Sequence, residues 1–293
     1  MPTRPVAPAA LRGRVFRGSA QVAAGHLTKG QLRSAAWQRL FRDVYACSSV
    51  ALTHEVRAGA AALLLLPGAV VCGRSAAVLW GVDAAGPDDD VEVTVPPGSP
   101  ACTVPGVRVR RWALLPDQIT TRRGIPVTVP ATTAVDIGRA PVPLAESVVL
   151  VDALVACGAT ELAAVRTAAA AATGSGCRRA RRVADLADGL AGSPQETRLR
   201  LLLHASRLPR PVAQHTVLDA NGDFVARVDF AWPAKRLAVE YEGRWHGRPQ
   251  HVASDRARLN RLTAAGWRVV FVTAEDLRDP DLVVARLAAL LLG

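Results

Sequence analysis

The feature that most constrains the fold is a predicted β-hairpin near the end of the chain, VAQHTVLDANGDFVARVDFAW (212–232). Two segments rich in strand-forming residues flank Asn221-Gly222, a dipeptide typical of the tight turn between antiparallel strands. A third strand pattern, KRLAVEYEG (235–243), follows a turn at Pro233. The sequence therefore predicts three consecutive strands joined by tight turns.

Helix patterns surround these strands. SPQETRLRLLLHASRL (193–208) predicts a helix with Ser193 at its N-cap and Pro194 in its first turn. The predicted order of elements is αβββαβα, made by 193–208, the hairpin, 235–243, HVASDRARLNRLTAAG (251–266), WRVVFVT (267–273) and DPDLVVARLAALLL (279–292).

Three carboxylates are expected to meet in this sheet. Side chains alternate between the two faces of a strand, so Glu240 and Glu242 point to the same side of the third strand. Asp229 lies on the neighbouring strand, on the face opposite its apolar residues. Because a tight turn joins these two strands, Asp229, Glu240 and Glu242 can converge at one place.

Converging carboxylates raise one another's pKa unless a cation joins them. Mg²⁺ (or Mn²⁺) prefers such oxygen ligands, and the bound ion can polarise a phosphoryl oxygen and activate water. Simpler interpretations stay open. Glu240 and Glu242 could face solvent and pair with arginines. Glu196 stands three residues after Ser193, so a helix capping box explains it as well as metal binding does.

The stretch from Ser193 onward resembles the DUF559 family, which is similar to the very-short-patch-repair endonucleases of the PD-(D/E)XK superfamily. The matching elements are SPxExxL at Ser193, VDF at Asp229, the EYEG strand at Glu240, and DRARLNRLTAAGWRVV (255–270). The resemblance implies a restriction-endonuclease-like αβββαβ core. It also implies that Asp229 and Glu240 are metal ligands and that Glu196 is an accessory carboxylate.

The sequence departs from the superfamily at its lysine, whose place Glu242 takes. His246 follows soon after, as a histidine does in the repair endonucleases, and it titrates in a range suited to proton transfer. We expect His246 to take the acid–base role, with an inert loop histidine as the alternative. Loss of the lysine would also fit a nuclease fold that only binds. Four arginines are expected to hold phosphates: Arg244, Arg248, Arg256 and Arg258.

The front of the chain predicts helices joined by short turns. Thr28 and Ser75 are the expected N-caps of two of them, and VYAC (44–47) looks like a strand. This pattern favours a winged helix-turn-helix that binds DNA. Its expected phosphate contacts are Arg33, Arg39 and Arg42.

Two further stretches resemble AbiEi antitoxin-type proteins. GHLTKGQL, RDVYACSS and SAAVLWG match the N-terminal domain of such proteins, and GIPVTVPATTAVDIGRA (124–140) matches a second AbiEi-type segment. The resemblance implies DNA binding by a winged helix and, in some members, transcriptional control. Asp136 lies in that second segment and Asp152 beyond it. A lone aspartate in a helix is more often a cap or an ion-pair partner than a catalytic group.

The sequence thus predicts an α+β multidomain protein. The expected parts are a leader (1–13), a winged helix-turn-helix (14–86), an α/β AbiEi-like middle segment (87–190) and a nuclease-like domain (191–293). The five cysteines are scattered, which argues against a zinc site and fits a cytoplasmic protein. No apolar run is long enough to span a membrane.

The charge balance favours a polyanionic partner. The chain carries 36 Lys+Arg against 25 Asp+Glu, a net charge of +11, which fits duplex or single-stranded DNA, although an arginine-rich genome could give the same balance. The first functional hypothesis is a metal-dependent DNA endonuclease or nickase, in repair or defence. The second is a DNA-binding regulator or antitoxin-like protein with an inactive nuclease fold. An RNA-processing nuclease, a homodimer and a toxin partner are left open.

Overall fold

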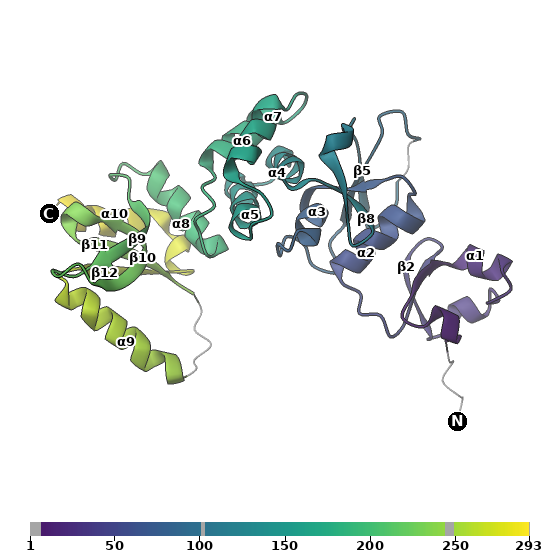
Figure 1. Ribbon diagram of the computed structural model, residues 1–293, viewed down its shortest axis with the longest axis horizontal. Helices are drawn as coiled ribbons and strands as arrows, with labels where there is room; N and C mark the ends of the chain where they lie inside the picture. Colours follow the sequence, from purple (N-terminus) through teal and green to yellow (C-terminus); the bar gives the residue numbers. More distant parts are fainter. Residues whose placement is uncertain (1–6, 101–102, 244–248, 293) are drawn as a thin grey trace. The chain divides into compact units, whose positions relative to one another are not determined.

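The computed structural model describes residues 7–100, 103–243 and 249–292, and it divides into two compact units (Figure 1). Unit 1 comprises Met1–Pro141 and Cys157–Ala184, and unit 2 comprises Val142–Ala156 and Asp185–Gly293. The chain therefore enters unit 2, returns to unit 1 and enters unit 2 again. None of the described helices combines the length and the apolar character needed to cross a membrane.

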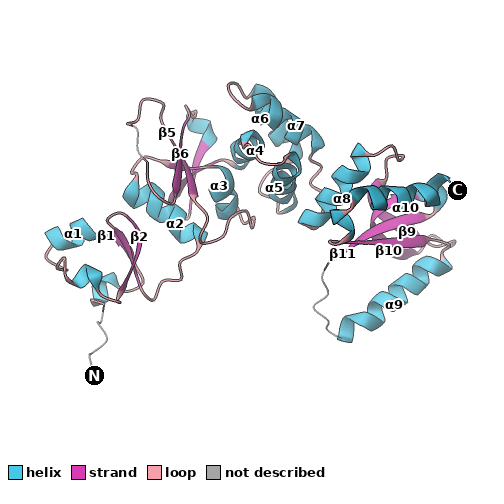
Figure 2. Cartoon of the chain, turned by 180° about the vertical axis from the view of Figure 1, so that it is seen from behind, coloured by secondary structure: helices cyan, strands magenta, loops and turns pink. Residues whose placement is uncertain are grey.

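Unit 1 begins with a small antiparallel sheet (Figure 2). Its strands β1 (Val15–Arg17), β2 (Trp37–Phe41) and β3 (Val44–Cys47) lie in the order β1-β3-β2. Between β1 and β2 the chain forms one short helix, α1 (Gly18–Ala23), and one 3-10 turn, η2 (Gln31–Arg33). The Thr28 hydroxyl accepts a hydrogen bond from the Gln31 N–H (3.2 Å), so the expected cap is present, but it caps this single turn.

The expected helix-turn-helix is not confirmed, because within the described residues only the short η2 turn follows α1 before β2. Trp37 and Phe41 are buried at the two ends of β2, and Arg39 between them is exposed, so the segment behaves as a strand. Asp43 turns the chain with a φ of 61°, and its carboxylate accepts a hydrogen bond from the Ser19 N–H (2.7 Å). This turn fixes the β2–β3 hairpin.

The larger part of unit 1 is a five-stranded sheet with helices. The strand order is β6-β5-β4-β8-β7, and the buried valines of β5 and β8 lie in its core. The elements are α2 (His54–Ala60) with its π-helical extension η3 (Ala61–Leu65), β4 (Val70–Val71), α3 (Gly73–Leu79), β5 (Val91–Val95), β6 (Val107–Arg111), η4 (Pro116–Gln118), β7 (Ile119–Arg122), β8 (Ile125–Thr128), α4 (Pro130–Arg139), α6 (Leu162–Ala171) and α7 (Cys177–Leu186).

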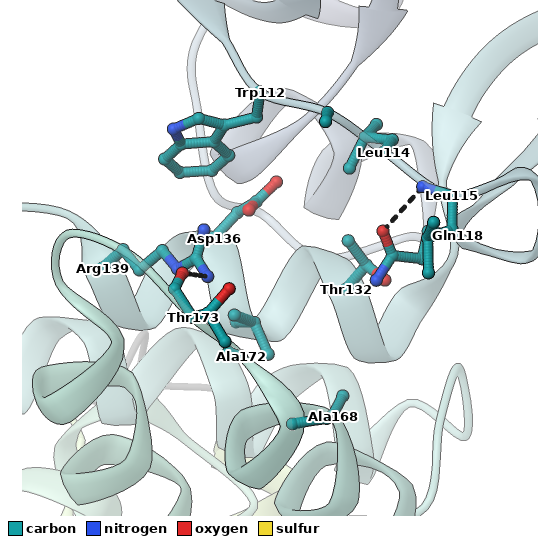
Figure 3. Close-up of a pocket in the computed structure, with 13 residues that line it drawn as sticks. Trp112, Leu114, Leu115, Gln118, Thr132, Asp136, Arg139, Ala168, Ala172 and Thr173 are labelled. Carbon is teal, nitrogen blue, oxygen red and sulfur yellow. Dashed lines mark hydrogen bonds between the residues drawn. The ribbon is translucent and has the colours of Figure 1, made fainter.

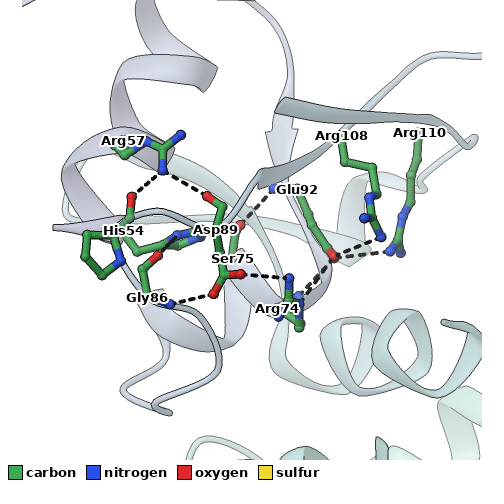
Figure 4. A network of polar contacts seen from close by, with 10 residues as sticks. His54, Arg57, Arg74, Ser75, Gly86, Asp89, Glu92, Arg108 and Arg110 are labelled. Carbon is green, nitrogen blue, oxygen red and sulfur yellow. Dashed lines mark hydrogen bonds and ion pairs between the residues drawn. The ribbon is translucent and has the colours of Figure 1, made fainter. Parts of the chain in front are cut away.

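A buried polar network ties α2, α3 and β5 together, and it corrects the role expected for Ser75 (Figure 4). Ser75 lies inside α3, not at its N-cap, and its Oγ accepts a hydrogen bond from the Glu92 N–H (2.8 Å). His54 Nδ1 lies 2.9 Å from the Gly86 carbonyl oxygen, and Nε2 lies 2.7 Å from Ser75 Oγ. A carbonyl only accepts, so Nδ1 carries the hydrogen and Ser75 donates to Nε2. Burial accordingly lowers the pKa of His54.

Glu92 is the buried anion of the same region. Arg110 lies 3.1 Å from its carboxylate, Arg74 3.6 Å and Arg108 4.0 Å. Gly73 opens α3 with a φ of +55°, and a Cβ at this position would lie 1.9 Å from Glu92 Oε2. Glycine is therefore required here by both the backbone conformation and the close approach of the carboxylate.

Unit 2 has the order of elements expected from the sequence. The helix α5 (Leu144–Ala156) precedes α8 (Pro194–Ala205), β9 (Val212–Leu218), β10 (Phe224–Trp232), β11 (Leu237–Glu242), α9 (Pro249–Ala264), β12 (Arg268–Thr273) and α10 (Pro280–Leu292). The sheet order is β12-β11-β10-β9, with antiparallel pairs except for the parallel pair β11–β12. The predicted hairpin and third strand are thus confirmed.

Helices cover both faces of this sheet (Figure 2). On one face, Leu199 of α8 and Leu287 of α10 pack with Phe230 and Val239. On the other, Leu262 of α9 packs with alanines of β10 and β11. On β11 neighbouring residues therefore belong to opposite faces, as the alternation predicted. On β10 the prediction is wrong, because Ala226 and Val228 pack on the α9 side, whereas Phe230 and Trp232 pack on the side of α8 and α10.

A buried ion pair joins α5 to α8. Asp152 Oδ2 accepts hydrogen bonds from Arg200 Nη2 (2.7 Å) and from the Thr197 hydroxyl (2.8 Å). Its other oxygen accepts from the backbone N–H groups of Asp188 (2.9 Å) and Gly189 (3.0 Å). The interpretation of Asp152 as an ion-pair partner is confirmed, and all four contacts lie within unit 2.

Candidate functional site

Asp229 is the central residue of the candidate site. It lies on β10 next to Phe230, which pairs with Val239 of β11. Its Oδ2 accepts a hydrogen bond from the backbone N–H of Tyr241 (2.9 Å), so the side chain reaches across to the neighbouring strand. The carboxylate is partly buried, and no ion pair links it to a Lys, Arg or His side chain in the described part of the chain.

Glu196 approaches Asp229 from the first turn of α8. Ser193 caps that helix, because its hydroxyl accepts a hydrogen bond from the Glu196 N–H (3.2 Å). Glu196 Oε2 accepts from the Gly192 N–H (2.8 Å) and from Gln214 Nε2 (3.3 Å). Glu196 therefore accepts from the residue before the Ser193 cap and not from Ser193 itself, so the full capping box is not formed, and Glu196 also contacts Gln214 of β9.

Gln214 on β9 connects the two carboxylates. Its amide nitrogen lies 3.3 Å from Glu196 and 3.5 Å from Asp229, and its oxygen accepts from Arg227 Nε (2.8 Å). The backbone of Gln214 has a φ of 50°, a conformation that costs a non-glycine residue of order 1–3 kcal/mol. Gln214 was not predicted from the sequence, although a polar residue within a strand-forming segment could have indicated it.

The pKa of Asp229 is raised to about 6, and burial is the largest cause. The charges of Glu196 and Glu240 also raise it, whereas the hydrogen bonds from the Tyr241 N–H and Gln214 lower it. Asp229, Glu196 and Glu240 thus lie close enough to act on one another electrostatically. Such a group is stabilised by any cation that enters it.

Glu240 already has a cationic partner. The side chain lies on β11, is only 9% exposed as a residue, and faces α9. Arg258 of α9 donates from Nη2 to Oε1 (2.6 Å) and from Nη1 to Oε2 (2.7 Å). The same Nη2 also donates to the Arg227 carbonyl (2.7 Å). Arg258 was expected to bind a phosphate, but in the structure it binds the Glu240 carboxylate.

A hollow of about 280 Å³ opens beside this pair, and its lining includes Glu240, Arg258, the exposed Glu242 and the exposed Arg256. Arg244, His246 and Arg248 lie outside the described residues. In unit 1, Arg33, Arg39 and Arg42 are exposed, with Arg39 Nε donating to the Phe41 carbonyl (3.3 Å).

The donor chemistry of the site fits a hard divalent cation, because carboxylate oxygens are what Mg²⁺ and Mn²⁺ prefer. Asp229 and Glu240 are the residues that would hold it, with Glu196 as a third oxygen donor. Within the described ranges, no three His, Cys, Asp or Glu side chains are grouped closely enough to form a metal site as they stand. Metal binding would therefore require Arg258 to release Glu240.

One part of this chain matches a known protein family. Residues 69–188 match the AbiEi antitoxin C-terminal domain, which confirms the AbiEi resemblance of the middle segment. Two Mycobacterium tuberculosis proteins, uncharacterized protein Rv2248 of strain ATCC 25618 / H37Rv and uncharacterized protein MT2308 of strain CDC 1551 / Oshkosh, are each 31% identical over 269 residues. Each match covers 88% of this chain and 93% of the relative.

A solved structure is also similar, the crystal structure of the RV2827C protein from Mycobacterium tuberculosis. It has a TM-score of 0.41 and 19% sequence identity, and the match covers 70% of this chain and 83% of that one. A likeness at this level carries no argument about the function of this chain.

Proposed function

This chain belongs to the family of the mycobacterial proteins Rv2248 and MT2308 and carries an AbiEi antitoxin C-terminal domain, and on that basis we propose that it acts on nucleic acid. The proposed activity is that of a metal-dependent DNA endonuclease or nickase, a phosphodiester hydrolase located in unit 2. Its setting would be defence or DNA repair. The resemblance of residues 193–293 to the DUF559 and PD-(D/E)XK nucleases supports this proposal, as does the αβββαβα order of unit 2.

The observation that carries the proposal is the environment of Asp229. This carboxylate lies within the fields of Glu196 and Glu240, is partly buried, and has a pKa raised to about 6. A carboxylate with a purely structural role gains stability from a cationic partner, as Asp152 does from Arg200. Asp229 has hydrogen bonds but no such partner among the described residues, which favours a cation supplied from solution.

Each residue has a separate part in the proposed reaction. Asp229 and Glu240 would hold Mg²⁺ or Mn²⁺, which when bound polarises a phosphoryl oxygen and lowers the pKa of water. Gln214 keeps the Asp229 and Glu196 carboxylates at fixed positions through its amide. Arg256 beside the hollow can contact a phosphate, and so can Arg258 once it leaves Glu240.

The residues on and after β11 complete the proposal. Glu242 ends the strand at the hollow and can assist in holding the cation. His246 would transfer the proton in place of the missing lysine, because imidazole is the side chain suited to proton transfer near neutral pH. Arg244 and Arg248 would hold phosphates, and in unit 1 the exposed Arg33, Arg39 and Arg42 would add further phosphate contacts.

A second candidate is a DNA-binding regulator or antitoxin-like protein that does not cleave. Two observations favour it. Residues 69–188 match an antitoxin domain, and Arg258 neutralises Glu240 through both oxygens. In this case the carboxylates would have lost their metal, and Arg258 would be a permanent partner.

The test is cleavage of supercoiled plasmid and of single-stranded DNA by the full chain, with Mg²⁺, Mn²⁺ or EDTA. We expect Asp229→Ala and Glu240→Ala to abolish cleavage and to retain DNA binding, since removing a carboxylate also lessens repulsion of phosphate. Asp223→Ala is the matched control, because this exposed aspartate belongs to the same hairpin but makes no contact with the site.

A second readout does not depend on cleavage. Mn²⁺ binding measured by electron paramagnetic resonance should be lost in both variants and kept in the control. If the wild-type protein binds DNA but neither binds Mn²⁺ nor cuts DNA, the nuclease proposal is wrong and the regulator is favoured. Cleavage at the wild-type rate by both variants would contradict the site assignment alone.

A further inference from the structure

Two hollows of the described chain differ in what they offer a ligand. In unit 1, a hollow of about 470 Å³ lies beside Asp136 and Arg139 (Figure 3). Asp136 Oδ2 and Arg139 Nε have no hydrogen-bond partner in the described chain, but both atoms are closed off from solvent and cannot reach a ligand there. In unit 2, the hollow of about 280 Å³ beside Glu240 is lined by Arg258, whose side chain is 32% exposed. The unit 2 hollow therefore presents a charge that a ligand can reach.

Glu240 and Arg258 belong to both parts of the candidate site. The charge of Glu240 acts on Asp229, and Glu240 also lines the hollow. Arg258 donates to both oxygens of this carboxylate, at 2.6 and 2.7 Å, and it lines the hollow as well. A change in this one ion pair would therefore affect the carboxylates and also any molecule bound in the hollow.

Glu240 needs a cation at all times. Its side chain is only 11% exposed, and a buried carboxylate that loses its partner is strongly destabilising. Arg258 can therefore leave only when another cation takes its place. A divalent ion held by Asp229 and Glu240 would be such a cation, because carboxylate oxygens are its preferred ligands.

Arg258 in turn needs an anion in place of Glu240, and the hollow is where it can meet one. A guanidinium gives a phosphate the same paired hydrogen bonds that it gives a carboxylate. The exposed Arg256 lines the same hollow and adds a second positive charge. Glu240 and Glu242 line it too, and they would repel a phosphate until a cation neutralises them. The hollow is therefore suited to a phosphate that arrives together with a divalent ion.

We propose that Arg258 is a positioning residue that exchanges Glu240 for a phosphate of the nucleic-acid backbone when a divalent ion binds at Asp229 and Glu240. The ion and the backbone then bind cooperatively, and each binds more weakly alone. This inference rests on the proposed nuclease function and adds that the metal site is completed on the nucleic acid. Coupling between two bound ligands is typically about 5- to 150-fold in affinity.

The test is the affinity of the full chain for a short labelled DNA duplex, measured by fluorescence anisotropy with Mn²⁺ or with EDTA at constant ionic strength. A phosphorothioate backbone, which resists hydrolysis, keeps the duplex intact. We expect Mn²⁺ to tighten duplex binding by the wild type at least about fivefold. In Arg258→Met, Glu240 no longer has a competing partner. Mn²⁺ should therefore bind the free variant more tightly than the free wild type in electron paramagnetic resonance, and it should tighten duplex binding less.

Arg256→Met is the matched comparison, because it removes a positive charge from the same hollow but leaves the Glu240–Arg258 pair in place. It should weaken duplex binding to the same degree with Mn²⁺ and with EDTA. Its effect on Mn²⁺ binding by the free protein should be small. If Arg258→Met fails to fold, Arg258→Lys takes its place, because a single ammonium lacks the paired geometry of the guanidinium. Arg258→Lys should show the same two changes to a smaller degree.

Two results would overturn the exchange. One is equal duplex binding by the wild type with Mn²⁺ and with EDTA. The other is equal Mn²⁺ affinity of the free wild type and the free Arg258 variant, which would leave the proposed metal site standing and reject only the role of Arg258. If Mn²⁺ binds neither protein, with the duplex or without it, the proposed nuclease site is wrong as well.

Discussion

Asp229→Asn is expected to stabilise unit 2 above pH 7 and to change its stability little at pH 4. The pKa of this carboxyl is raised from 3.8 to about 6 in the folded chain. Well below pH 3.8 the group is protonated in both the folded and unfolded states, so the penalty is absent there. Between pH 4 and 6 the unfolded state loses its proton first, and the free energy of unfolding falls as the pH rises.

The size of this effect follows from the shift. Two pKa units correspond to about 3 kcal/mol at roughly 1.4 kcal/mol per unit, and partial exposure of Asp229 reduces this to about 1–2 kcal/mol. The penalty is complete above pH 7. Asparagine carries no charge, and its oxygen can still accept from the Tyr241 N–H, so the variant avoids the penalty and keeps that bond.

Urea unfolding at pH 4, 6 and 8, followed by fluorescence, measures this difference. The gain of Asp229→Asn should grow from about zero at pH 4 to about 1–2 kcal/mol at pH 8. Mg²⁺ at pH 8 should stabilise the wild type and not the variant. Asp223→Asn, an exposed change in the same hairpin, serves as the control. A gain that is equal at pH 4 and 8, or a loss at pH 8, would refute the electrostatic reasoning.

Two further predictions concern stability. Arg200→Ala should cost about 3–5 kcal/mol in urea unfolding, because it leaves the buried Asp152 without its cation, whereas Arg198→Ala, at a more exposed ion pair of the same helix, should cost at most about 1 kcal/mol. Equal losses would contradict this. Gly73→Ala should lower the free energy of unfolding of unit 1 by at least about 1–3 kcal/mol, since the new Cβ meets Glu92 and the φ is left-handed; an unchanged thermal midpoint would contradict it.

Local chemistry made much of unit 2 predictable. Asn221-Gly222 permits a tight turn, Ser193 offers a hydroxyl at the start of a helix, and the alternation of apolar residues assigns each strand residue to a face. These signals are contained within a few neighbouring residues. The structure has the turn and the Ser193 cap, and it keeps the alternation along β11 but not throughout β10.

What the sequence could not predict depends on distant partners. Ser75 appeared to be a helix cap because its neighbours look helical, but it is buried against His54 and Glu92, which come from other elements. Arg258 appeared to be free for phosphate, yet Glu240 binds it through two hydrogen bonds. In each case the choice between partners is made by tertiary packing.

The β2 strand was not predicted for another reason. Trp37 and Phe41 are four residues apart, which is also the spacing of one helix face, so the apolar pattern fits both structures. The left-handed turn at Asp43 decides in favour of a hairpin, and an aspartate with positive φ is hard to foresee from sequence.

The return of the chain to unit 1 between α5 and α8 bears on how such a protein can evolve. The carboxyl-terminal hundred residues look like a cassette that recombination could move to another gene. A gene segment beginning at residue 191 would nevertheless leave α5 behind, and Arg200 would then be inherited without Asp152. A successful transfer must carry α5 along or exchange Arg200 for an apolar residue. Lineages that carry this segment alone should therefore bear the second change.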